Sequence, residues 1–182
     1  MPRSLKSKPQ TPIPILRPRF PASRVERWAS RFADLDDSRI ERIAAAARRR
    51  GFLLKAELVA VARWKTPRSR KRVARNPESF VNAVTGAALS TPDERLRIEV
   101  LTLLDGVDWP TASVILHFCH VDAYPVLDYR ATWSLGVAKR PRYDFPFWRE
   151  YTRACRRLAT RSGCSMRAVD RALWQYAKER QG

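Results

Sequence analysis

Apolar residues recur at helical spacing along almost the whole chain, and this feature most limits the fold. From about residue 22 onward they stand three and four positions apart, and no useful stretch alternates apolar with polar residues as a strand would. The strongest helix start is Thr91-Pro92-Asp93-Glu94, which combines a cap, a proline and a reciprocal glutamate. The sequence therefore predicts an all-α protein with about eight or nine helices.

Further signals place the other helices. Capping boxes stand at residues 23–26 and 38–41, and a capping residue precedes proline at residues 66–67 and 76–77. A short helix is expected at residues 55–64, and two longer ones at about residues 147–161 and 165–178. On the helix that begins near Thr91, the expected buried stripe consists of Leu96, Val100, Leu103 and Leu104.

The first 21 residues differ from the rest in composition. They hold six prolines and five basic residues but no acid. Because proline breaks helices, residues 1–21 are predicted to form a disordered arm, and residues 22–182 a helical domain. The arm could bind phosphates without sequence preference, or it could be a solubilising tail.

Positive charge is in large excess. Lys and Arg total 36 against 18 Asp and Glu, which gives a formal net charge of +18. Such a surplus favours a polyanionic partner, with nucleic acid first and an anionic membrane surface second. The six Trp residues favour a folded domain with a packed core.

Composition also bounds the location of the protein. Three Cys residues lack metal-like spacing, and no apolar run approaches the ~20 residues of a membrane span. No secretory signal is evident at the N-terminus. We therefore expect a monomeric cytoplasmic protein with no membrane partner, associated with the nucleoid if it is bacterial.

A tight turn separates two apolar runs at residues 104–116, which read LDGVDWPTASVIL. Gly106 lies in the turn, Asp108 can cap a new helix, and Pro110 falls in the first turn of that helix. The amide groups at such a helix start, together with the helix dipole, suit a phosphate. The same pattern is also that of an ordinary helical hairpin inside a bundle.

The segment resembles the helix-hairpin-helix of the endonuclease III-like DNA glycosylase superfamily. The matching residues are Gly106, Val107, Thr111, Ala112 and Ser113. Downstream, the sequence YPVLD places Asp128 at the distance from the hairpin where the family has a characteristic Asp. The resemblance implies a two-lobed helical bundle with a central hairpin at about residues 91–120, and double-stranded DNA as the partner.

Departures from the family pattern refine that expectation. Asp108 stands where the hairpin has its second glycine, and Pro110 stands where strand-cleaving members have a nucleophilic lysine. The four-Cys iron–sulfur loop is also missing. The resemblance therefore implies a monofunctional enzyme with no cofactor beyond a monovalent cation at the hairpin carbonyls.

Asp128 is the predicted catalytic residue. Cleavage of an N-glycosidic bond passes through a cation-like sugar, which a fixed carboxylate can stabilise while it orients the attacking water. The alternative is that Asp128 only caps the helix that follows it.

Residues expected to bind DNA come from the hairpin and from the basic strip ARWKTPRSRKRVARN, for which a solvated basic face is the alternative. They are Gly106, Val107, Asp108, Trp109, Thr111, Ala112, Trp64, Lys65, Arg68, Arg70, Lys71, Arg72 and Arg130. The expected base pocket consists of His117, Tyr124, Tyr129 and Trp133, with Trp64 and Trp109 as the preferred aromatic walls. A zinc site at His117 and His120 is not expected, because the chain has only two His.

The sequence thus predicts a DNA glycosylase that excises a damaged or mismatched base, with Asp128 assisting water. Two alternatives remain open. One is a non-catalytic helix-hairpin-helix DNA-binding protein, and the other is an RNA-binding or nucleoid-compacting protein. Linear spacing does not name the base, because a pocket depends on which side chains converge in space.

Overall fold

The computed structural model describes residues 15–33, 36–139 and 141–181. Within these ranges the chain forms ten α-helices, three 3-10 helices and no strand, which confirms the all-α prediction. The α-helices are α1 (Val25–Ala29), α2 (Ser38–Arg50), α3 (Lys55–Lys65), α4 (Arg70–Val73), α5 (Glu78–Ser90), α6 (Glu94–Glu99), α7 (Trp109–Cys119), α8 (Tyr129–Ser134), α9 (Phe145–Ser162) and α10 (Met166–Arg180). The 3-10 helices are η1 (Ala22–Arg24), η2 (Pro67–Ser69) and η3 (Val100–Leu103).

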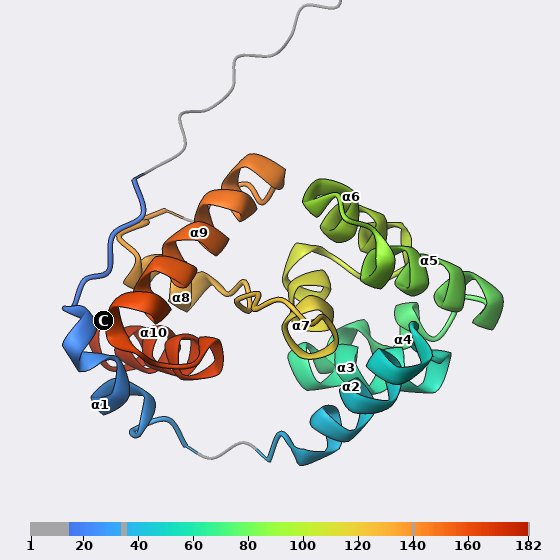
Figure 1. The fold of residues 1–182 in the computed structure, drawn as a ribbon, viewed down its shortest axis with the longest axis horizontal. Helices are drawn as coiled ribbons and strands as arrows, with labels where there is room; N and C mark the ends of the chain where they lie inside the picture. Colours follow the sequence, from blue (N-terminus) through green and yellow to red (C-terminus); the bar gives the residue numbers. More distant parts are fainter. Residues whose placement is uncertain (1–14, 34–35, 140, 182) are drawn as a thin grey trace, which may run out of the picture.

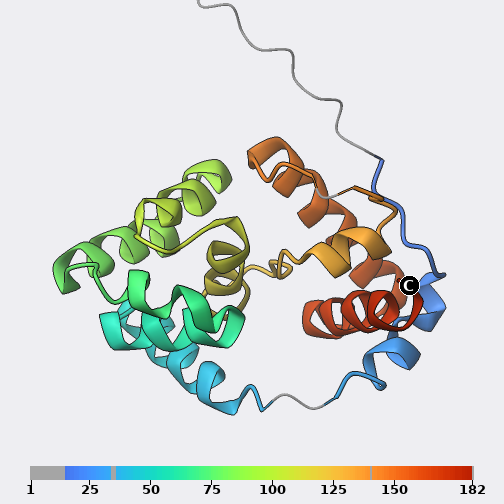
Figure 2. The same cartoon turned by 180° about the vertical axis from the view of Figure 1, so that it is seen from behind.

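The helices gather into two groups (Figure 1). Helices α2 to α7 form one group, and α1 joins α8, α9 and α10 in the other, as the view from behind also shows (Figure 2). Helix α7 packs against α2, α3 and α6, whereas α10 packs against α1, α8 and α9. The chain passes between the groups twice, between α1 and α2 and between α7 and α8, so the group at the C-terminus also contains the first helix.

The segment just before α1 is packed in extended form against the second group. Its backbone amides at Arg17 and Arg19 donate to the carbonyls of Leu135 (2.9 Å) and Ser134 (2.8 Å). Leu16 and Phe20 are buried. The prediction of a disordered arm is therefore wrong from residue 15 to residue 21, because proline excludes a helix but not a docked extended segment. Residues 1–14 of the predicted arm lie outside the described residues.

The hairpin region begins with α6, whose cap differs from the predicted one. Asp93 caps the helix by accepting from the amide of Leu96 at 2.7 Å, whereas Thr91 was expected to do so. Asn76 does not cap α5 either, since its side chain bonds the backbone of Asp105 instead. The capping boxes at residues 23–26 and 38–41 are likewise wrong, because neither α1 nor α2 has a side-chain cap.

The predicted apolar stripe of α6 and η3 is also corrected. Leu96 and Leu103 are exposed, whereas Ile98 and Leu101 are fully buried. Arg97 turns inward because its guanidinium donates to the carbonyl of Thr91 and to the hydroxyl of Tyr124, which fixes the buried face. The change to 3-10 geometry at Val100 then alters the helical period.

The two C-terminal helices match their predictions to within a few residues at each end. Asp144 and Ser165 cap α9 and α10, and Gly163 ends α9 with a left-handed backbone (φ +68°). None of the described helices combines the length and the apolar character needed to cross a membrane.

Candidate active site and nucleic-acid interface

The hairpin turn packs directly against α4. Gly106 has φ +77°, and a Cβ placed on it would lie 2.9 Å from the Cβ of Arg72 and 3.0 Å from the backbone nitrogen of Val73. Only glycine fits both the left-handed backbone and this close approach. The turn therefore brings the predicted hairpin and the basic strip into contact.

The side chain of Asn76 holds the turn in place. It is 4% exposed. Its Nδ2 donates to the carbonyls of Val73 (2.9 Å) and Asp105 (3.0 Å), and its Oδ1 accepts from the amide of Asp105 (2.8 Å). One buried side chain thus joins the end of α4 to the start of the hairpin turn.

Asp108 serves as the cap of α7. Its Oδ1 accepts from the backbone nitrogen (3.1 Å) and the hydroxyl (2.9 Å) of Thr111. The carboxylate therefore turns toward its own helix and satisfies an amide that a bound phosphate would otherwise use. Any phosphate at this hairpin relies on the neighbouring cations more than on the first turn of α7.

Two of the neighbouring cations, Arg68 and Arg72, line a cavity of about 320 Å³ beside the turn. It is lined by Thr66, Arg68, Ser69, Arg72, Gly106, Asp108 and Thr111. Four exposed basic side chains of the strip form no ion pair with any acid in the described part of the chain. These are Arg68, Arg70, Lys71 and Arg72.

Several predicted DNA contacts on the hairpin are packing residues. Val107, Thr111 and Ala112 are all buried, so their side chains are not available to DNA. Trp109 is partly buried, and its ring centroid lies 6.5 Å from that of Trp148. It lines neither the cavity at the turn nor the one at Asp128, so its predicted place as a pocket wall is wrong.

Asp128 lies at the start of α8 and is held through both oxygens. Its Oδ1 accepts from the amide of Arg130 at 2.9 Å, which makes it the helix cap, and its Oδ2 lies 3.0 Å from Nζ of Lys65. The side chains of Asp128 and Lys65 are 20% and 12% exposed. The carboxylate is therefore oriented and shielded, yet still reachable from outside.

The opening beside Asp128 is a cavity of about 400 Å³ between α3 of the first group and α8 and α10 of the second. Three aromatic side chains line it, namely Phe32, Trp64 and Trp174. Its basic lining residues are Lys65, Arg167, Arg171 and Lys178, and the acids are Asp128 and Asp170. Aromatic walls with a surplus of cations suit a flat ligand that carries negative charge.

Asp37 organises one side of this cavity. It is 6% exposed. Its Oδ2 accepts from Arg167 (2.6 and 2.9 Å) and from Arg171 (3.2 Å), and its Oδ1 accepts from the indole nitrogen of Trp64 (3.2 Å). The wall made by Trp64 is therefore fixed by the same carboxylate that orients the two arginines.

Asp170, which also lines the cavity, lies close to His117. Its Oδ1 accepts from the amide of Val126 at 3.1 Å, and its Oδ2 lies 3.2 Å from Nδ1 of His117, which also lies 2.6 Å from the carbonyl of Tyr124. Burial raises the pKa of Asp170 to about 8 and lowers the pKa of His117 to about 4. Both shifts favour the uncharged form of each group, because burial penalises charge.

The two cavities are neighbours along the chain. Lys65 lines the one that holds Asp128, and the next residue, Thr66, lines the one at the hairpin turn. The predicted catalytic residue, the hairpin and the basic strip thus converge around the end of α3.

The predicted base pocket does not form as expected. Tyr124 is buried and stacks on Trp148, and Trp133 packs against Arg19 and Tyr176. Tyr129 is exposed, and Nδ1 of His117 lies 3.2 Å from Oδ2 of Asp170. None of these four residues lines the cavity at Asp128. Which side chains enter a cavity depends on how the helices face one another, and closeness to Asp128 in the sequence does not decide it. Arg130 lies over the ring of Trp174, at 4.9 Å, beside the cavity.

Most of the residues that do line the cavity were missed from the sequence. Four of them, Arg167, Arg171, Trp174 and Lys178, stand four, three and four positions apart on α10 and share one face of that helix. That spacing was a usable signal for a basic and aromatic helix face. Phe32 and Asp170 gave no comparable signal.

A monovalent cation at the hairpin would compete with existing donors. The carbonyls of Leu104 and Asp105 already accept from the amide of Val107 (3.0 Å) and from Asn76 (3.0 Å). Comparison with protein-family models, with curated proteins and with solved structures found no match for this chain.

Proposed function

We propose that this chain is a DNA-binding protein of the helix-hairpin-helix glycosylase type, which hydrolyses the N-glycosidic bond of a damaged or mismatched base. One observation carries the proposal. The carboxylate of Asp128, oriented by the amide of Arg130 and by Lys65, opens into the aromatic cavity between the two helix groups. The hairpin that motivates the resemblance lies next to that cavity.

The cavity suits a base that has left the helical stack. A flipped base needs flat apolar walls, and Phe32, Trp64 and Trp174 supply them. Lys65, Arg167 and Arg171 offer positive charge to the phosphates that flank an extruded nucleotide. The hairpin and the basic strip would hold the neighbouring backbone, because their shared cavity adjoins this one at Lys65 and Thr66.

Asp128 would act on the sugar. With Oδ1 bound to the amide of Arg130, its Oδ2 can face the cation that develops at the sugar and orient a water molecule for attack. In the free protein Lys65 offsets part of that negative charge. A DNA phosphate that drew Lys65 away would leave the carboxylate free to stabilise the sugar cation.

The decisive experiment compares Asp128→Asn with Asp144→Asn on a panel of lesion-bearing duplexes. Both residues cap a helix, at α8 and α9, but only Asp128 lines the cavity. Base release is expected to fall by about 10²–10⁴-fold in Asp128→Asn and to stay unchanged in the control. Duplex affinity should be kept by both variants. Equal release by Asp128→Asn and the parent would remove Asp128 from the mechanism.

The same panel separates enzyme from binder. Base release from at least one lesion, visible as a strand break after alkali treatment, supports the glycosylase. Tight duplex binding with no release from any lesion would instead favour the non-catalytic DNA-binding protein. Preference for structured RNA over duplex at one salt concentration would favour the RNA-binding alternative.

The position of Lys65 favours a second candidate function, strand cleavage at an abasic site. The sequence has no amine at Pro110, but the fold places the Lys65 amine 3.0 Å from Asp128. After it loses a proton, that amine could attack the aldehyde carbon of an abasic sugar and release water, which forms an imine. Loss of a proton from the carbon next to the imine would then break the C3′–O bond, and the 3′ phosphate would leave with the bonding electrons.

Borohydride reduction distinguishes the two candidates, because it converts such an imine into a permanent protein–DNA link. The second function predicts a trapped adduct with the parent protein and none with Lys65→Met. Lys71→Met serves as the control, since that exposed lysine lies outside the Asp128 cavity. If no adduct is trapped, and base release produces a strand break only after alkali treatment, the hydrolytic function is the one that remains.

A further inference from the structure

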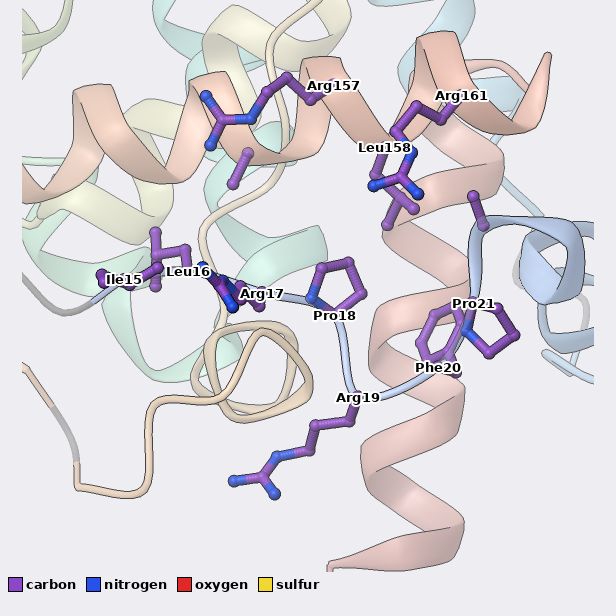
Figure 3. Close-up of a pocket in the computed structure, with 12 residues that line it drawn as sticks. Ile15, Leu16, Arg17, Pro18, Arg19, Phe20, Pro21, Arg157, Leu158 and Arg161 are labelled. Atoms are coloured by element: carbon purple, nitrogen blue, oxygen red, sulfur yellow. The ribbon is translucent and has the colours of Figure 1, made fainter.

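A second basic groove lies on the far side of the C-terminal helix group. It forms between the extended residues 15–22 and helix α9, and it encloses about 710 Å³ (Figure 3). It shares no lining residue with the cavity at Asp128. In Figure 3, the side chains of Arg157 and Arg161 both extend from α9, and Arg161 is directed toward the segment that carries Pro18.

The arginines of α9 form a regular stripe. Residues 149, 153, 157 and 161 are all Arg, so they recur every fourth position and share one face of the helix. Arg149 and Arg153 both pair with Glu150, at 3.8 and 2.9 Å. Arg157 and Arg161 pair with no acid among the described residues, and these are the two that line the groove.

The opposite wall adds a further unpaired cation. Arg17 lies on the extended segment, where its backbone amide is bound to Leu135 while its exposed side chain pairs with no described acid. Arg19 is engaged differently, since its guanidinium donates to the carbonyl of Trp133. No acidic residue lines the groove. Like charges four residues apart destabilise a helix, so Arg157 and Arg161 would be stabilised by a bound anion.

Apolar side chains form the rest of the lining. Pro18 and Pro21 belong to the extended segment, and Ala154 and Leu158 belong to α9. A single nucleic-acid strand presents both phosphates and apolar base faces, whereas a duplex presents mainly phosphates to a groove wall. We propose that this groove binds one unpaired nucleic-acid strand, with its phosphates on Arg17, Arg157 and Arg161.

The proposal is independent of the Asp128 chemistry and has its own test. The test compares a groove variant, Arg157→Gln/Arg161→Gln, with a control variant, Arg149→Gln/Arg153→Gln. The control variant removes the same charge from the same stripe of the same helix. Binding of a fluorescent oligothymidylate is titrated over a series of salt concentrations. The groove variant should lower the slope of log affinity against log salt by about 1.4, or about 0.7 for each lost phosphate contact. Its affinity should fall roughly tenfold, and the control should keep the parent slope.

Three further measurements make the outcome specific. Arg157→Lys/Arg161→Lys keeps the charges and should keep the slope. Affinity for a duplex should change less than affinity for the single strand in the groove variant. Asp128→Asn should leave the oligothymidylate slope unchanged, so loss of base release and loss of groove binding are read separately.

The opposite results would overturn the proposal. An equal loss of slope in the groove variant and the control would show that only total charge matters. An equal loss for duplex and single strand would exclude an unpaired strand as the ligand. A groove variant that binds like the parent, with an unchanged circular dichroism spectrum, would exclude the groove as a nucleic-acid site.

Discussion

Nζ of Lys65 lies 3.0 Å from Oδ2 of Asp128, and this pair connects the last residue of α3 to the cap of α8. The two helices belong to different groups, so the contact joins the groups at the cavity. Both side chains are mostly shielded from water, which strengthens their attraction relative to a surface pair. The same contact therefore bears on stability and on the charge of the carboxylate that we propose as catalytic.

A double-mutant cycle should measure that attraction. Lys65→Met and Asp128→Asn, alone and together, are expected to show a coupling of about 1–2 kcal/mol in urea unfolding. The exposed pair Arg95 and Glu99, also 3.0 Å apart, is the matched control and should give about 0.3–0.5 kcal/mol. If the two cycles agree, the shielding of the Lys65 pair contributes nothing to its strength.

Gly106 should tolerate substitution much less than Gly51. Both have a left-handed backbone, but a Cβ at Gly51 meets nothing within 4 Å, whereas one at Gly106 meets the backbone of Val73 at 3.0 Å. Gly51→Ala should cost about 1–2 kcal/mol of unfolding free energy from backbone strain alone. Gly106→Ala should cost more and should also weaken duplex binding, because the turn must move away from Arg72. Thermal unfolding and duplex titration of both variants check this expectation. Equal losses of unfolding free energy in the two variants would contradict it.

Asn76→Ala should destabilise the hairpin without touching the proposed catalytic residue. The substitution removes three hydrogen bonds and leaves the backbone groups of Val73 and Asp105 without these partners. We expect a loss of about 2–3 kcal/mol in urea unfolding. Asn82→Ala, on the neighbouring helix α5, offers a control of the same residue type. Hydrogen exchange should show faster exchange at the amides of residues 104–108 in Asn76→Ala only, and unchanged exchange there would show that Asn76 does not hold the turn.

The stability of the protein should fall as the pH rises from about 6.5 to about 8. Asp170 has a raised pKa in the folded state, so its contribution to stability is lost as the pH rises toward about 8. The lowered pKa of His117 has the opposite effect, but only below its ordinary value of 6.5. The two slopes therefore cancel between about pH 4 and pH 6.5, and only the Asp170 slope remains above that range.

The expected loss over the upper range is about 2 kcal/mol, from 1.36 kcal/mol per pH unit. Urea unfolding at several pH values measures it. Asp170→Asn should remove the decline while keeping an acceptor for the amide of Val126. A decline of the same size in Asp170→Asn would assign it to another group.

Local patterns predicted the parts of this structure that depend on neighbours in the sequence. The helical period gave the all-α class and the two long helices α9 and α10, and the turn residues located the hairpin near Gly106. These predictions hold because helix periodicity and glycine turns are local properties of the chain. A predicted helix cap was wrong where the capping side chain forms a hydrogen bond to a residue distant in the sequence, as Asn76 does.

The sequence predicted Asp128 as the candidate catalytic residue, but it did not predict the surroundings of Asp128. Its partner Lys65 comes from another helix group, and Trp174 and Phe32 reach the cavity from opposite ends of the chain. The predicted walls His117, Tyr124 and Trp133 were taken up by the core and by other contacts. Linear distance from Asp128 carried no information on which helix faces would meet.

The sequence by itself determined that the chain is helical and strongly basic, with a glycine turn followed by an acid at a helix start. Only the tertiary structure decided that the acid meets a lysine in an aromatic cavity and that the extended residues before α1 complete a second basic groove. Periodicity and capping act within a few residues, whereas a cavity is defined by side chains from helices that become neighbours only after the core has formed.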